Sequence, residues 1–158
     1  MTTAETGTRD WGDTVRIKAE VQATGGRTFS GFLHLLPFAS IHLGPETPED
    51  VLNRDEAFFA LTDRQEHTIF IAKAQVLTVV VDQTTRDPDR LHAARTIGLK
   101  VELSDGSEYT GTVSSELPPT RTRAIDFLNH GAGFFALYVA DTARYINRAH
   151  VRTVSPSS

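Results

Sequence analysis

Hydrophobic and polar residues alternate along two separate stretches of the chain, and a glycine-containing turn follows each stretch. The earlier stretch has its apolar positions at Val15, Ile17, Ala19 and Val21, followed by Gly25-Gly26. The later stretch has them at Ile97, Leu99, Val101 and Leu103, followed by Asp105-Gly106. Strict alternation predicts a half-buried strand. Asp-Gly and Gly-Gly pairs favour the positive φ of a tight primed turn, so each strand should continue into a hairpin.

Further blocks recur in the same order along the chain. Phe-Phe-Ala-Leu at 58–61 returns unchanged at 134–137, and Asp-x-Leu-Asn at 50–53 returns at 126–129. Ile-Ala-Lys-Ala-Gln-Val at 71–76 matches Ile-Asn-Arg-Ala-His-Val at 146–151. Upstream, Gly26 and Gly31 match Gly106 and Gly111, and Lys18–Glu20 aligns with Lys100–Glu102. Ordered agreement of this kind indicates an internal duplication.

Each copy contains five predicted strands. Gly31 and Gly111 stand inside the second strand, where glycine marks a bend. Asp50 and Asp126 suit the N-cap of a one-turn helix that would direct Leu52 or Leu128 into the core. The last three strands are expected at 58–61, 68–72 and 76–81, and again at 134–137, 144–147 and 151–154. Five short strands with a bent second strand predict an all-β fold, a tandem duplication of a small five-stranded SH3-like (Sm-like) barrel.

The repeat boundaries define four segments. We expect a flexible N-terminus at 1–12, a first repeat at 13–82, a linker at 83–96 and a second repeat at 97–155. Asp87-Pro88 has the residues of an N-cap and a first helical position, which predicts a short linker helix over 88–95. A unit of about 60 residues covers its core poorly by itself, so the copies should pack together as a pseudo-dimer.

Composition narrows the possible functions. The chain has 158 residues, a formal net charge of −4 and no cysteine, which excludes disulfides, thiolate nucleophiles and cysteine-based zinc sites. The longest apolar stretch, Val76–Val81, is too short to cross a bilayer, and the polar N-terminus lacks the features of a secretory signal. We therefore expect a cytoplasmic protein without membrane insertion. Three scattered lysines argue against a strong non-specific grip on phosphate backbones.

The second copy resembles the Sm-like family. The match consists of Leu-Lys-Val-Glu-Leu-Ser-Asp-Gly at 99–106 with Tyr-Thr-Gly at 109–111, and of Ile-Asn-Arg-Ala-His-Val at 146–151. The resemblance implies single-stranded RNA binding. Two departures stand against it, because a long loop separates Gly111 from Asp126, and Arg148-Ala149 replaces the family's Arg-Gly pair.

The chain is also similar to a family of small bacterial β-domains of unknown function. That unit consists of a hairpin, Asp-Phe-Leu-Asn, a Phe-Phe-x-Leu strand and Ile-Asn-x-x-His-Val. The second copy carries the full pattern, whereas the first has Ala72 in place of Asn147 and Gln75 in place of His150. This resemblance implies no particular activity.

No catalytic constellation is recognisable. The six histidines have no zinc-type spacing, and phosphate-binding glycine loops and the nucleophile elbow are absent. Acidic residues lie in polar loops, where no burial would shift a carboxylate pKa towards acid–base work. We expect no enzymatic activity, no cofactor and no metal.

The candidate binding surface consists of polar residues of the second copy: Asp126, Asn129, Asn147, Arg148 and His150. Asp126 and Asn129 can be a ligand contact, although Asx residues also cap and close turns. In each Phe-Phe pair alternation sends one ring inward and one outward, and an outward ring can cover a neighbouring copy or stack on a base.

These features favour a non-catalytic assembly or adaptor module acting through protein–protein contacts or self-association. The alternative is an Sm-like single-stranded RNA-binding protein that uses Asn129, Arg148 and His150. An enzyme ranks third. Because the second copy keeps the complete motifs, we expect it to carry the contact surface, and the first copy to serve mainly in packing.

Overall fold

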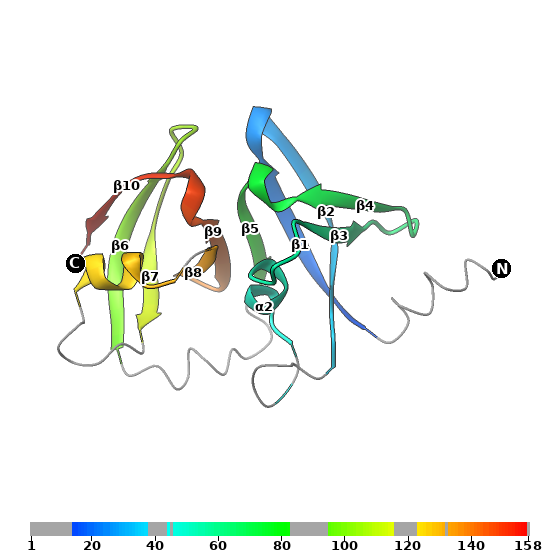
Figure 1. The fold of residues 1–158 in the computed structure, drawn as a ribbon, viewed down its shortest axis with the longest axis horizontal. Coiled ribbons are helices and arrows are strands. Elements are labelled where there is room, and N and C mark those ends of the chain that lie inside the picture. The colour runs from blue at the N-terminus through cyan, green and yellow to red at the C-terminus, as the bar shows by residue number, and fades with distance from the viewer. Residues whose placement is uncertain are drawn as a thin grey trace.

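The computed structural model describes residues 14–37, 44, 46–82, 95–115, 123–131 and 133–157. Within them, ten strands form one antiparallel sheet in the order β10-β6-β7-β8-β9-β5-β1-β2-β3-β4 (Figure 1). The predicted all-β class is confirmed. Among the described residues no strand pairing closes this sheet into a barrel, so β10 and β4 lie at its two open edges.

The first half of the sheet holds five strands, one short helix and two 3-10 turns. Its strands are β1 (Val15–Ala23), β2 (Arg27–Leu35), β3 (Phe58–Thr62), β4 (Thr68–Ala72) and β5 (Val76–Asp82). Helix α2 (Pro48–Leu52) precedes β3, and the 3-10 turns are η1 (Thr24–Gly26) and η2 (Lys73–Gln75). The predicted fourth strand at 68–72 is confirmed.

The second half repeats this order of strands and helix. Its strands are β6 (Arg95–Leu103), β7 (Glu108–Ser115), β8 (Phe134–Val139), β9 (Thr142–Asn147) and β10 (Val151–Pro156). Helix α4 (Ala124–Asn129) precedes β8, and the 3-10 turn η4 (Arg148–His150) joins β9 to β10. The N-terminal segment 1–12 and most of the predicted linker helix lie outside the described residues, and Arg95 belongs to β6.

Strand pairing relates positions in the two halves. Ala19 lies opposite Gly31 in the first half, and Leu99 lies opposite Gly111 in the second. Leu99 is therefore the counterpart of Ala19, and Lys100 that of Glu20. The predicted alignment of Lys18 with Lys100 is therefore wrong by two residues. Alternation cannot detect this error, because a shift of two keeps every side chain on the same face of its strand.

Gly31 and Gly111 lie where the next strand crosses closely. A Cβ atom at Gly31 would come 2.8 Å from the carbonyl oxygen of Thr62, and one at Gly111 would come 2.4 Å from that of Tyr138. Strand β2 pairs with β3 only at Phe32, and β7 pairs with β8 only at Thr112, the residue after each glycine. Glycine thus permits the close approach at which each half bends.

Turns and caps differ in detail from the predictions. In the Asp105-Gly106 turn only Gly106 has positive φ (+91°), and Asp105 instead accepts bonds from the backbone and hydroxyl of Ser107. Helix α2 begins after Thr47, which forms a capping box with Asp50. Asp50 therefore is the third helical residue and not the N-cap, since Thr47 supplies the capping oxygen. Asp126 likewise lies inside α4.

The β8–β9 hairpin contributes to two hydrophobic cores. One side of it, including Phe134, Ala136 and Tyr145, packs in the core of the first half with Val79 and Leu52. The other side packs in the core of the second half through Phe135, Leu137 and Ile146. Strand β9 also pairs with β5 along five residues, so the two halves share one continuous junction (Figure 1).

Candidate functional site

Two of the predicted binding residues lie at the junction between the halves. The Asn147 side chain is buried and its amide donates to the carbonyl oxygens of Lys73 (3.1 Å) and Val76 (3.0 Å). His150 Nε2 lies 2.8 Å from the carbonyl oxygen of Ala74. Both residues therefore bind the η2 turn of the first half. Whether they also contact a ligand stays a prediction.

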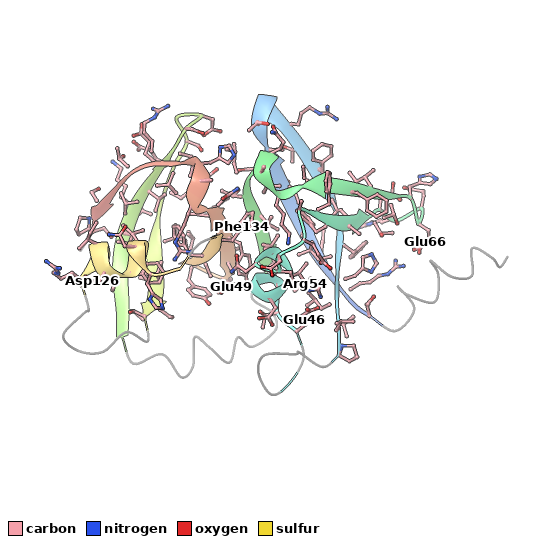
Figure 2. All side chains as sticks on the ribbon, viewed as in Figure 1. Glu46, Glu49, Arg54, Glu66, Asp126 and Phe134 are labelled. Carbon is pink, nitrogen blue, oxygen red and sulfur yellow. The ribbon has the colours of Figure 1, made fainter. Side chains whose placement is uncertain are left out.

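Arg148 holds α4 against its own half. Its guanidinium donates to the carbonyl oxygens of Leu128 (3.3 Å) and His130 (3.2 Å), and it lies 5.1 Å from the centroid of the Phe135 ring. Burial lowers the pKa of Arg148. Asp126 pairs with the exposed Arg123 (3.2 Å), and Asn129 is an exposed residue at the end of α4. The five predicted residues thus spread over the junction, the underside of α4 and its exposed face, with Asp126 labelled in Figure 2.

A polar cluster at the junction was not predicted from the sequence. Arg144 on β9 donates to Thr78 Oγ1 (2.9 Å) on β5 and to Gln22 Oε1 (3.2 Å) on β1. Tyr109 donates its hydroxyl to the same Gln22 oxygen (3.0 Å), and the Arg144 guanidinium lies 3.8 Å from the centroid of the Tyr109 ring. Burial lowers the pKa of Arg144. This arrangement satisfies a half-buried cation by hydrogen bonds and a cation–π contact, and it joins four strands.

Asn53 joins α2 to β8. The Phe134 amide donates to Asn53 Oδ1 (2.7 Å), and Asn53 Nδ2 donates to the Phe134 carbonyl oxygen (3.0 Å). Gly133 allows this approach, because a Cβ atom there would lie 2.4 Å from Asn53 Oδ1. The Phe134 side chain is 2% exposed and lies between the two halves (Figure 2). Asn53 belongs to the repeated Asp-x-Leu-Asn block, whose role as a junction contact the sequence did not reveal.

The corresponding surface of the first half is exposed. Phe134 and Tyr145 are buried, whereas their counterparts Phe58 and Phe70 are 57% and 69% exposed. Ile69 is also exposed, at 42%. We call Phe58, Ala60, Ile69 and Phe70 the β3–β4 patch: Phe58, Ala60 and Phe70 share one face of the sheet, and Ile69 lies at the β4 edge on the other face. The patch includes residues of the edge strand β4 and holds Phe58, Ile69 and Phe70, three of the six exposed large hydrophobic residues in the described part of the chain.

The two Phe-Phe pairs differ in the exposure of their outward ring. One ring inside and one outside is confirmed for the first pair, since Phe59 is 5% exposed and Phe58 57%. It is wrong for the second pair, where Phe134 and Phe135 are both buried because the first half covers the outward ring. Most of the exposed large apolar side chains in the described ranges therefore lie in the first half, with Ile125 in the second. Which half carries the contact surface stays a prediction.

A groove of about 260 Å³ runs beside the patch. It is lined by His34, Val51, Arg54, Glu56, Phe58, Phe59, Ala60 and Phe70. Arg54 forms a charge-assisted pair with the buried Glu46, which also accepts the Leu36 amide (2.9 Å). Figure 2 labels Arg54 and Glu46 beside α2. Burial lowers the pKa of His34, whose Nε2 lies 2.7 Å from Thr62 Oγ1. Polar contacts therefore fix Arg54 and His34 in a groove lining that also contains apolar side chains such as Phe58 and Phe70.

A larger hollow of about 590 Å³ lies on β1 and β2 beside the Asp63–Gln65 turn, and it is walled by charged side chains such as Lys18, Glu20 and Arg64. A backbone bond from His67 lowers the pKa of Asp63, which is a feature of the turn. Within the described ranges no group of three or more acidic or histidine side chains is placed to hold a metal ion. Nor does any helix in that part of the chain have the length and hydropathy needed to cross a membrane.

Comparisons with protein-family models, with curated proteins and with solved structures found no match to this chain. The geometry of the junction and of the β3–β4 patch is therefore the basis for a function.

Proposed function

We propose that this protein is a non-catalytic assembly module that binds through the β3–β4 patch. The observation that carries the proposal is the contrast between matched rings. Phe134 and Tyr145 are buried between the halves, whereas Phe58 and Phe70 occupy the same positions of the first half and are mostly exposed. Contiguous exposed apolar surface at an open sheet edge is typical of protein contact sites.

We further propose that each half is one copy of a small SH3-like (Sm-like) unit. Three observations support this: the same order of strands, a glycine at the same crossing in Gly31 and Gly111, and a 3-10 turn before the last strand. Under this proposal the junction is an assembly contact between two units that have become one chain, and the β3–β4 patch is the corresponding contact of the first unit.

Single-stranded RNA binding has less support as a second candidate. Arg148, the cation at the centre of the predicted RNA surface, donates to two carbonyl oxygens and lies over an aromatic ring. Asn147 and His150 bond to the first half. A contact to phosphate or bases would have to compete with these bonds. Titration with oligo-U at low salt tests this candidate, because phosphate contacts weaken with added salt.

The test of the assembly function compares the wild type with Phe58→Ser/Phe70→Ser. Molar mass is measured by light scattering over a range of protein concentrations, and partners are captured from lysate with the tagged full chain. We expect the wild type to self-associate or to hold a partner in fixed stoichiometry, and the double variant to lose that contact.

Ile125→Ser is the matched control, because Ile125 is 52% exposed but lies on α4 in the other half. This control should keep the association. The proposal fails when the wild type remains a monomer at every concentration and captures no protein that the double variant releases.

A further inference from the structure

The two edges of the sheet differ in how they are protected. Edge strands usually carry charged residues or proline, which prevent pairing with another chain. Strand β10 has both, in Arg152 and Pro156. Strand β4 reads Thr-Ile-Phe-Ile-Ala over Thr68–Ala72, with neither charge nor proline. Only the β4 edge therefore has the composition of a strand that pairs with another chain.

Repetition of the β5–β9 junction between chains would place β4 beside β10 of a second copy. A steric difference opposes this arrangement. Asn53 reaches Phe134 because residue 133 is glycine, and a Cβ there would lie 2.4 Å from Asn53 Oδ1. The residue before Phe58 is Ala57, which carries that Cβ. Asn129, the counterpart of Asn53, is therefore blocked from the corresponding contact.

The polar contacts of the junction are also missing at the β4 edge. Asn147, which donates to two carbonyl oxygens of the first half, has Ala72 as its counterpart. Arg144, which binds Gln22, has Ile69 as its counterpart, and Gln22 corresponds to Glu102. In a repeated junction the Glu102 carboxylate, which pairs with Arg152 (3.3 Å) and accepts from Thr153 Oγ1 (3.0 Å), would lie beside Ile69, which has no side-chain donor to offer it in place of Arg144. The junction thus does not propagate from chain to chain.

Strand β4 is instead complementary to itself. Ile69 and Ile71 flank Phe70 symmetrically, so a two-fold axis at Phe70 places each Phe70 opposite its symmetry mate and each Ile69 opposite an Ile71. Antiparallel pairing about this axis gives each of the five β4 residues a partner on the second chain, and none of the five residues is charged. The rings of Phe58 and Phe70 lie on one face, because Ala60 pairs with Phe70 and Phe58 pairs with Ala72.

We propose that the β3–β4 patch binds a second copy of this chain through two-fold β4–β4 pairing, which gives a dimer that stops at two chains. The inference rests on the proposed assembly function and names its partner. The closed symmetry follows from the unprotected β4 edge, the protected β10 edge and the blocked head-to-tail contact.

Cysteine trapping tests the geometry, since the chain has no cysteine of its own. Directly opposed residues of antiparallel strands have Cα atoms about 4.5–5.5 Å apart, which is within disulfide range. Under mild oxidation, the full chain with Phe70→Cys should form a disulfide-linked dimer by itself. A mixture of Phe70→Cys and Val154→Cys chains is the second arm. Head-to-tail pairing would place Val154 opposite Phe70, as Val79 lies opposite Tyr145, and would link unlike chains.

Light scattering of variants without cysteine gives an independent measurement. The wild type should have about twice the mass of the 17.4 kDa chain. Ile69→Arg, which introduces the residue type of Arg144 at the β4 edge, should halve that mass, whereas Thr153→Arg on the β10 edge should leave it unchanged. Circular dichroism establishes that each variant is folded.

The outcomes separate the two proposals. Links between Phe70→Cys and Val154→Cys chains without links between Phe70→Cys chains overturn the two-fold dimer, as does a mass that rises above two chains. A monomeric wild type whose tagged chain captures a foreign protein through Phe58 and Phe70 overturns the dimer but leaves the assembly function intact. A monomer that captures nothing overturns both.

Discussion

Gly133→Ala should destabilise the protein more than Gly131→Ala does, although both glycines lie in the same loop. Both have positive φ, +82° at Gly133 and +89° at Gly131, so both substitutions carry the same backbone strain. A Cβ atom at Gly131 meets nothing within 4 Å, whereas one at Gly133 lies 2.4 Å from Asn53 Oδ1. Only the Gly133 variant should therefore displace Asn53 from Phe134.

The magnitude follows from the bonds that are lost. An alanine in the left-handed region costs about 1–2 kcal/mol, and this cost is common to both variants. Displacement of Asn53 breaks two hydrogen bonds to the Phe134 backbone, each contributing about 0.5–1.5 kcal/mol. Gly133→Ala should therefore lower the free energy of unfolding by about 1–3 kcal/mol more than Gly131→Ala.

Urea denaturation followed by far-ultraviolet circular dichroism measures this difference. A double-mutant cycle with Asn53→Ala adds a sharper test. Once the Asn53 side chain is removed, Gly133→Ala should cost no more than Gly131→Ala, so the two changes should be less than additive. Equal destabilisation by the two glycine variants in the wild-type background would refute the role given to the Asn53 contact.

Two further predictions concern burial. Phe134→Ala should lower the free energy of unfolding by about 3–5 kcal/mol, because the Phe134 ring is only 2% exposed. Phe58→Ala should cost far less when measured on the dissociated chain at low concentration, because the Phe58 ring is 57% exposed. Similar costs for the two variants would contradict the asymmetry of the halves. Burial lowers the pKa of His34 from its usual 6.5, so its stabilising contribution is complete above pH 6.5 and declines as the pH falls towards the folded-state pKa. In His34→Gln the urea midpoint should fall less between about pH 7 and 5 than it does in the wild type. If the midpoint falls equally with pH in both proteins, His34 does not make this contribution.

Local sequence patterns were sufficient for the strands and for the positions of the turns, although not for the turn geometry or the helix caps. Alternation at Val15–Val21 and at Ile97–Leu103 predicts β1 and β6, because a strand between core and solvent imposes a period of two on its side chains. Glycine at 31 and 111 predicts the bend, since any side chain there would collide with the crossing strand. The pattern could not detect the shift of two residues in the alignment of the halves, because such a shift keeps each side chain on the same face. It also did not show that Thr47, and not Asp50, is the N-cap of α2.

The candidate site was harder to predict. Asn147, Arg148 and His150 are polar and adjacent in sequence, and the chain alone gives no sign that two of them bond to the first half. Arg144 looks like any outward residue of an amphipathic strand until β9 is placed against β5. Such contacts join residues far apart in sequence, and no local periodicity encodes them.

By itself the sequence determined that the chain is all-β and that its motifs recur in order, and it predicted one outward ring in each Phe-Phe pair. These properties depend on side-chain period, turn chemistry and composition, which are local. Only the tertiary structure decided that the outward ring of Phe134 is covered while that of Phe58 is exposed. The reason is that β9 pairs with β5 inside the chain, which uses one edge of each half and leaves β4, with Ile69 and Phe70, uncovered.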